Sequence, residues 1–241
     1  MLEANPRASR TVPLVSKVCT IRMVPIATDI ITAEITGHTS PLAELKEMNI
    51  PNYGVKEAVF PFNMFQEVDP ILGPERRSTG EVLGMSKSYG EAFYKAQEAT
   101  QTKLPLEGTV LISVNGKDKD EIVPAVKTLA EDGFKIIATD GTHKVLTENG
   151  IASTLVKKIY EGRPNIADMI TNGEVDLIFN SPIGKNAEYD DSYLRKAAIK
   201  AKVPYMTTVA AAKATAEGIH YIKNNKGADL KSLQEMHAEI K

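Results

Sequence analysis

The sequence has a single cysteine, Cys19, among its 241 residues. A disulfide within the chain is therefore impossible, and nothing points to an oxidising compartment. A nucleophilic cysteine is one alternative. A lone cysteine in an apolar stretch is more typical of a small buried hydrophobic residue, and we interpret Cys19 in that way.

Long apolar runs and an excess of charge are also missing. No run approaches the roughly 18 apolar residues of a membrane-spanning helix, and the first residues lack the apolar core of a signal peptide. The 29 basic and 31 acidic residues leave a formal charge of −2, which gives no indication of nucleic-acid binding. We expect a cytoplasmic protein without membrane or nucleic-acid partners, in which any anionic ligand is held by a local pocket.

Common catalytic patterns are missing as well. The four histidines show no metal-ligand spacing, and the sequence has no Walker A, G-x-S-x-G or H-E-x-x-H string. Candidate sites therefore have to come from the fold that the sequence predicts.

The chain divides into two regions of different pattern. Residues 1–100 lack a regular order of strands and helices, although we expect helical spacing over 26–35, strands at 55–60 and 80–85, and a helix over 89–99. Residues 101–107 are typical of a linker. Residues 226–241 form a polar tail.

Residues 108–225 alternate regularly between the two kinds of element. We expect strands at 109–114, 134–139, 155–160, 175–180 and 205–208, and helices at 119–131, before Gly150, at 164–172, at 192–202 and at 210–222. This order predicts an α/β Rossmann-like domain, with a parallel sheet, right-handed crossovers and helices on both faces.

Ligands of such sheets bind at the carboxyl ends of the strands. Thr139 and Thr142 flank the start of a helix there, where free N–H groups favour an anion; a simple helix cap is the alternative. Asn180 ends the fourth strand and suits a base or ribose edge, or a capped turn. Lys119 and Lys158 are either surface charges or converge on the same anion.

The string 161–168, EGRPNIAD, predicts a constrained turn with Pro164 as the first residue of the next helix. Near the start of the chain, Glu3 and Asn5 lie two residues apart and share one side of a strand, which suits two oxygen ligands of Mg²⁺. Arg7 and Arg10 would then meet phosphate. A surface strand end is the alternative for this segment.

Six strings together resemble the large-subunit family of carbamoyl phosphate synthase, in the family's order. Residues 2–13 (LEANPRASRTVP), 55–57 (VKE) and 72–82 (LGPERRSTGEV) resemble the end of its second ATP-grasp unit. Residues 137–142 (IATDGT), 161–166 (EGRPNI) and 180–185 (NSPIGK) resemble its terminal allosteric domain, which has a methylglyoxal-synthase-like fold.

The resemblance implies specific roles. The family makes carbamoyl phosphate, for pyrimidine and arginine biosynthesis, from bicarbonate, ammonia and two ATP. By resemblance, Glu3 and Asn5 are ligands of Mg²⁺ (or Mn²⁺), and Arg7 and Arg10 lie near the phosphates of ATP. A nucleotide monophosphate effector, such as UMP or IMP, is held by the residues Lys119, Thr139, Thr142, Lys158 and Asn180. An ornithine site is implied at Glu57 and Thr207.

The partners that the resemblance implies are the remainder of the large subunit and a glutamine amidotransferase small subunit, in an oligomeric enzyme. The nucleotide-clasping part of an ATP-grasp fold is not in this chain, so we expect a fragment or one product of a split gene, inactive alone. A free-standing nucleotide-sensing module is the alternative. A third interpretation, methylglyoxal synthase, needs a general-base aspartate where this chain has Arg163, with Asp168 inside the following helix.

Overall fold

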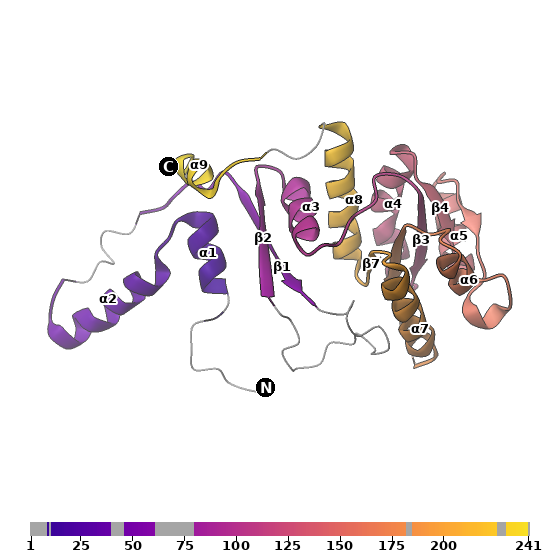
Figure 1. The fold of residues 1–241 in the computed structure, drawn as a ribbon, viewed down its shortest axis with the longest axis horizontal. Helices are drawn as coiled ribbons and strands as arrows, with labels where there is room; N and C mark the ends of the chain where they lie inside the picture. The colour runs from indigo at the N-terminus through magenta and orange to yellow at the C-terminus, as the bar shows by residue number, and fades with distance from the viewer. Residues whose placement is uncertain are drawn as a thin grey trace.

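A computed structural model describes residues 9, 11–39, 46–60, 80–181, 185–225 and 230–240, with the backbone alone at 185–190. Two helices and a hairpin from the amino-terminal part lie on one side of the molecule, and the parallel sheet with its helices lies on the other (Figure 1). Of the helices in these ranges, none combines the length and apolar character that crossing a membrane requires.

The amino-terminal unit consists of α1 (Thr11–Cys19), α2 (Met23–Thr36) and the antiparallel strands β1 (Tyr53–Val59) and β2 (Gly80–Ser86). The helical spacing predicted over 26–35 is confirmed as part of α2, and both predicted strands are present. Helix α1 was not predicted. Its Pro13 lies in the first helical turn, where a proline is tolerated because that N–H has no partner within the helix.

Helix α3 (Tyr89–Ala99) connects this unit to the rest of the chain and has the predicted bounds. It packs on β2 and on α8 (Val209–Asn224). Its Phe93 and Tyr94, together with Leu104, belong to the same hydrophobic core as Val110 of the sheet. Helix α3 therefore packs on elements from both sides of the boundary at residues 101–107, which stays a prediction.

The sheet is parallel throughout and has the strand order β5-β4-β3-β6-β7. Its strands are β3 (Thr109–Val114), β4 (Lys135–Ala138), β5 (Thr154–Leu155), β6 (Leu177–Ser181) and β7 (Tyr205–Met206). The predicted Rossmann-like α/β fold class is confirmed. The order places β3 and β6 in the middle, so the polar residues at their carboxyl ends are neighbours.

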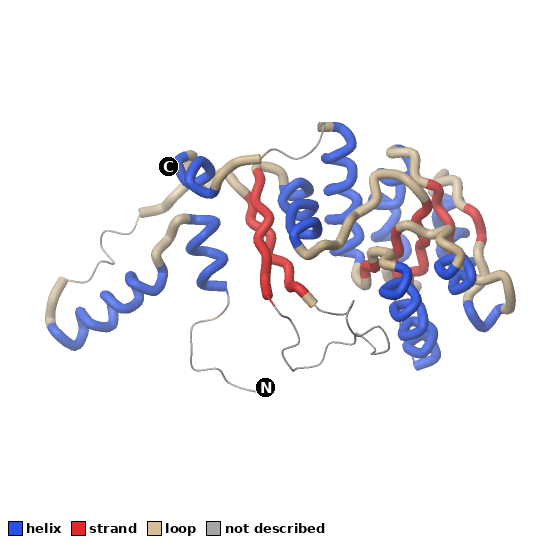
Figure 2. The backbone as a smooth tube through the Cα atoms, viewed as in Figure 1, coloured by secondary structure: helices blue, strands red, loops and turns tan. Residues whose placement is uncertain are grey.

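Helices cover both faces of this sheet (Figure 2). Val110 and Ile112 of β3 share a core with α4 (Lys119–Glu131), α5 (Asp140–Glu148) and α8, whereas Leu111 between them shares a core with α6 (Ile166–Thr171) and α7 (Lys185–Ala201). The two cores follow from the alternation of side chains along a strand. Buried on both faces, these strands are continuous apolar runs, as expected for a parallel sheet.

Two local predictions are wrong. The third strand, predicted over 155–160, is only Thr154–Leu155, because the chain turns into the short 3₁₀ helix η3 (Ile159–Glu161), where the Lys158 N–H donates to Glu161 Oε2 at 2.8 Å. Pro164 does not begin the next helix. Asn165 caps it instead, since its Oδ1 accepts from the Ala167 N–H at 3.0 Å, and α6 begins at Ile166.

Candidate functional site at the carboxyl edge of the sheet

Polar residues from three strands form a row at the carboxyl edge of the sheet. Ser113 of β3 pairs with Asn180 of β6, and the Thr139 N–H at the end of β4 donates to the Ile112 carbonyl at 3.3 Å. The Thr139 hydroxyl donates to Ser113 Oγ at 3.4 Å. Each of these three side chains lies two residues after a residue of the α6–α7 core, so all three share that face of the sheet.

Lys119 lies against the turn that starts α5. A methyl group placed on Gly141 would be 2.4 Å from Lys119 Nζ, so the ammonium occupies the space that this glycine leaves open. Thr139 is the N-cap residue of α5, and Gly141 lies in its first turn. The structure thus brings Lys119 and Thr139 to one helix N-terminus, where the helix dipole and a cation both favour an anion.

Thr142 and Thr139 are both buried, but their partners differ. The Thr142 hydroxyl accepts from the Val114 N–H at 3.3 Å and lies 3.4 Å from the Val114 carbonyl oxygen. The hydroxyl therefore joins α5 to β3. In this state Thr142 supports the turn from behind and does not present its hydroxyl to a ligand.

Lys158 lies beyond the end of β5, which neighbours β4: the Val156 N–H donates to the Ala138 carbonyl at 2.9 Å. This is the same sheet edge as Thr139. The Lys158 ammonium lies 5.8 Å from the centroid of the Tyr160 ring, a cation–π contact. Tyr160 is exposed, so Lys158 is held at the rim by an aromatic ring, and its ammonium remains near water.

Asn180 belongs to a buried polar network that was not predicted. Its Nδ2 donates to Asp191 Oδ1 at 2.7 Å and contacts the Tyr205 hydroxyl at 2.5 Å. Tyr205 also donates to Asp191, which forms an ion pair with Arg195 one turn later on α7. Burial raises the pKa of Tyr205 to about 12, so this phenol stays a neutral donor. The four-residue spacing of Asp191 and Arg195 was the available sequence signal.

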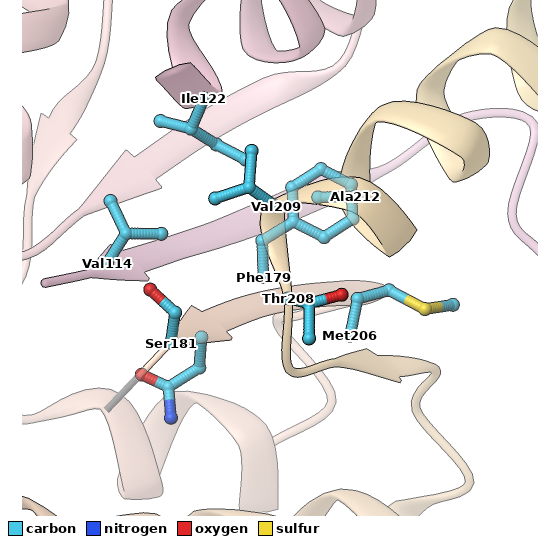
Figure 3. A pocket seen from close by; sticks show the side chains of 9 residues that line it. Val114, Ile122, Phe179, Ser181, Met206, Thr208, Val209 and Ala212 are labelled. Atoms are coloured by element: carbon cyan, nitrogen blue, oxygen red, sulfur yellow. The ribbon is translucent and has the colours of Figure 1, made fainter. Parts of the chain in front are cut away.

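A small pocket lies beside this row, between β3, β6, β7, α4 and α8 (Figure 3). Most of the side chains that line it are apolar, and the hydroxyls of Ser181 and Thr208 are among its polar groups (Figure 3). Its lining includes no cationic side chain. The edge that carries Thr139 and Lys119 is therefore the better candidate for a nucleotide phosphate.

The other predicted residues are not assembled in the same way. Glu57 of β1 accepts from Gln97 Nε2 at 3.1 Å, whereas Thr207 is exposed just after β7. Among the contacts of the described residues, none joins these two. Glu3, Asn5, Arg7 and Arg10 lie outside the described residues. Within the described part of the chain, no three His, Cys, Asp or Glu side chains gather as a metal site.

Asp168 is held as a structural carboxylate. Arg163 Nε donates to both of its oxygens, at 2.9 and 3.1 Å, and the Asn165 N–H donates to Oδ2 at 3.0 Å. The Arg163 hydrogen bond, followed by that of Asn165, lowers the pKa of Asp168 below its usual value. A general base gains from a raised pKa, so this geometry disfavours the methylglyoxal synthase interpretation.

Comparison with known proteins gives one consistent result. Residues 121–207 match the MGS-like domain family. The C-terminal section of the carbamoyl phosphate synthase large chain from Methanopyrus kandleri is 47% identical over 98% of this chain and 44% of its own length. The large chain from Archaeoglobus fulgidus is 47% identical over 99% of this chain and 22% of its length. The C-terminal section from Methanocaldococcus jannaschii is 45% identical over all of this chain and 40% of its length.

This chain therefore spans less than half of each of these three relatives, while nearly all of it is matched by them. The resemblance drawn from six short strings is confirmed, and it extends into the tail that those strings did not cover. Over nearly its whole length the chain is homologous to carbamoyl phosphate synthase large chains, and it carries the MGS-like domain of that family at residues 121–207.

Proposed function

We propose that this chain acts as the carboxy-terminal section of a carbamoyl phosphate synthase large chain, and that its sheet domain binds a nucleotide monophosphate effector at the carboxyl edge. The observation that carries the proposal is the position of the Lys119 ammonium against Gly141, in the first turn of α5 beside Thr139. A cation and a helix N-terminus there provide two independent attractions for phosphate.

The phosphate is held by Lys119, Thr139 and the N–H groups of the first turn of α5. Thr142 acts indirectly, by fixing α5 on β3. Asn180 faces the ribose or base through its amide oxygen, since its amide nitrogen already donates to Asp191. Lys158 approaches from the rim and adds charge. Ornithine would occupy a second position, near Glu57 and Thr207.

In the assembled enzyme the amino-terminal segment supplies part of an ATP site. Glu3 and Asn5 provide oxygen ligands for Mg²⁺ or Mn²⁺, and Arg7 and Arg10 contact the phosphates of ATP during phosphorylation of carbamate. The rest of the large subunit and an amidotransferase small subunit complete the active, oligomeric ligase. The chain alone is inactive: turnover of ATP by the purified chain with bicarbonate and Mg²⁺ would refute this part of the proposal.

A calorimetric titration with UMP, IMP, uridine and ornithine tests the effector site. We expect UMP or IMP to bind and uridine, which has no phosphate, to bind poorly. Lys119→Ala should weaken nucleotide binding about tenfold or more, because a charged hydrogen bond contributes about 1.5–3 kcal/mol. Its affinity should also depend less on salt concentration.

Lys117→Ala is the matched control, since Lys117 is exposed and lies two residues away in the turn before α4. Equal affinities of the Lys119→Ala and wild-type chains, with unchanged circular dichroism, would place the phosphate elsewhere. If neither nucleotide bound the chain but both bound it after co-expression with the remaining large-chain polypeptide, the site would need its partner. The alternative, a free-standing nucleotide sensor, predicts instead that such co-expression yields no carbamoyl phosphate synthesis.

A further inference from the structure

The last described helix, α9 (Leu233–Ala238), lies beside α1, far along the molecule from the sheet domain that precedes it in the sequence (Figure 1). Its Met236 is 7% exposed and shares a core with Val18 of α1 and Met85 of β2. The partly buried side chains around this core are those of Leu14, Cys19, Ile50 and Leu83. A segment that the sequence presents as a polar tail thus contributes an apolar side chain to the amino-terminal unit.

Polar contacts fix α9 on the same surface. His237 Nε2 lies 2.5 Å from the Lys17 carbonyl oxygen, in the last turn of α1. A carbonyl can only accept, so Nε2 carries the proton and donates. Carbonyls in the last turn of a helix lack partners within the helix, and this contact satisfies one of them.

Ion pairs lie just after the end of α9. Glu239 pairs with Lys87, which follows β2, at 2.8 Å, and with Lys231 at 3.0 Å. Contacts to α1 and contacts next to β2 therefore meet on one short helix. Exposed ion pairs contribute little by themselves, so the buried Met236 supplies most of the attachment and the polar contacts determine its orientation.

A helix of six residues does not form alone in water, because nucleation costs more than so few hydrogen bonds return. In this chain a capping box stabilises the first turn of the helix. Glu235 Oε2 accepts from the Ser232 N–H at 2.7 Å, and Ser232 Oγ accepts from the Glu235 N–H at 3.2 Å. The helix starts at a defined residue, which places Met236 and His237 on the side that meets α1.

The sheet domain is also joined to the amino-terminal unit through α3 and α8. A methyl group on Gly218 would lie 2.9 Å from the Gly90 carbonyl oxygen, and one on Gly90 would lie 2.9 Å from the main chain of Glu217. The backbones of the two helices are therefore in direct contact. Helix α9 follows α8 in the chain. The sheet domain is therefore connected to the amino-terminal unit twice, through α3, which precedes β3, and through α9, which follows α8.

We propose that the surface formed by α1 and β2 is a docking site for α9 in cis, and that this docking holds the amino-terminal unit in a fixed position on the sheet domain. The occupant is the chain's own segment 230–240, recognised by one apolar anchor, one carbonyl-capping donor and one acidic side chain. The proposal does not depend on effector binding or catalysis.

Met236→Asp in the full chain tests the proposal, with Met48→Asp as the matched control because Met48 is 39% exposed. When α9 leaves its docking site, the amino-terminal unit should open locally more often. We expect hydrogen exchange of amides in α1 and β2 to accelerate about tenfold or more, exchange in β3 and β6 to stay unchanged, and the radius of gyration from X-ray scattering to rise. A synthetic peptide of residues 230–240 should restore slow exchange.

Unchanged exchange in α1 and β2 would overturn the docking site. Faster exchange without a change in the radius of gyration would mean that α9 stabilises α1 only locally, and would overturn the proposed hold on the sheet domain. Met236→Ala and His237→Ala serve as milder variants if Met236→Asp prevents folding, and each should give a smaller change in the same amides.

Discussion

The hydroxyl of Thr142 is hydrogen-bonded to the main chain of Val114, which ties the first turn of α5 to the end of β3. Thr139, three residues earlier, is buried as well, and it donates to Ser113 Oγ at the carboxyl edge of the sheet. Two threonines that the sequence presents as an equivalent pair therefore have different partners. One is bonded to the main chain of β3, and the other is bonded to a side chain of the candidate site.

We expect Thr142→Val to lower the free energy of unfolding by about 1–2 kcal/mol, because it leaves buried main-chain groups without their partner. Thr139→Val should cost less, since it removes one hydrogen bond to a side chain, Ser113 Oγ, and leaves no main-chain group without its partner. Urea unfolding followed by circular dichroism measures both. Equal stabilities of the two variants would contradict the structural role of Thr142.

Gly141→Ala should weaken nucleotide binding without destabilising the fold. The added methyl group would meet Lys119 Nζ, the mobile end of a flexible side chain, and would push the ammonium away from the turn. Alanine is otherwise the better helix former, by about 1 kcal/mol. Calorimetry with UMP and thermal unfolding check the two halves of this prediction. If Gly141→Ala bound UMP as tightly as the wild type, Lys119 would not contact the phosphate.

Gly218→Ala should destabilise the protein by about 1–3 kcal/mol, although the same change inside most helices stabilises them. Its methyl group would meet the Gly90 carbonyl oxygen at 2.9 Å, and a backbone atom cannot move aside as a side chain does. Gly116→Ala is the control, because a methyl group there meets nothing within 4 Å. Urea midpoints of the two variants should differ, and similar midpoints would mean that α3 and α8 separate easily.

Stability should fall at alkaline pH partly through Tyr205. Its pKa is raised to about 12 in the folded chain, against about 10 when unfolded. The neutral phenol is thus favoured by folding, and its contribution is complete below pH 10 and is lost as the pH rises through 12. The chain has eight tyrosines and no tryptophan, so absorbance near 295 nm follows tyrosinate alone.

Tyr205→Phe should remove the last-titrating component of that absorbance and flatten the loss of stability between pH 10 and 12. The variant should be less stable at neutral pH, because Asp191 loses a donor. An unchanged alkaline titration curve would show that Tyr205 ionises with the exposed tyrosines.

The elements predicted best are those in which the hydrophobic pattern and the polar residues at both ends indicate the same bounds. Helix 119–131 and strand 109–114 have the predicted bounds because an apolar run or an amphipathic face coincides with a polar boundary at each end. The strand predicted over 155–160 failed because the Glu161 side chain captures the Lys158 N–H and turns the chain. A side-chain contact of that kind is not visible in hydrophobic periodicity.

Part of the candidate site was predictable for a simple reason. The carboxyl ends of parallel strands in one sheet lie at the same edge, so Thr139 and Asn180 could be placed there from the order of elements alone. The partners of Asn180 were not predicted, since Tyr205 and Asp191 reach it from β7 and α7 through packing that no short string records. Likewise, nothing in the sequence distinguished Thr142, which is bonded to the main chain of Val114, from Thr139, which is bonded to Ser113.

The contact between His237 and Lys17 joins residues 220 positions apart. The two partners are therefore synthesised at widely separated times. A ribosome adds roughly 5–20 residues per second, so α1 emerges many seconds before the helix that completes its core. During that interval the surface of Val18 and Met85 lacks Met236. The amino-terminal unit is therefore synthesised before the helix that completes its core, and its exposed apolar surface is where we expect a chaperone to bind the nascent chain.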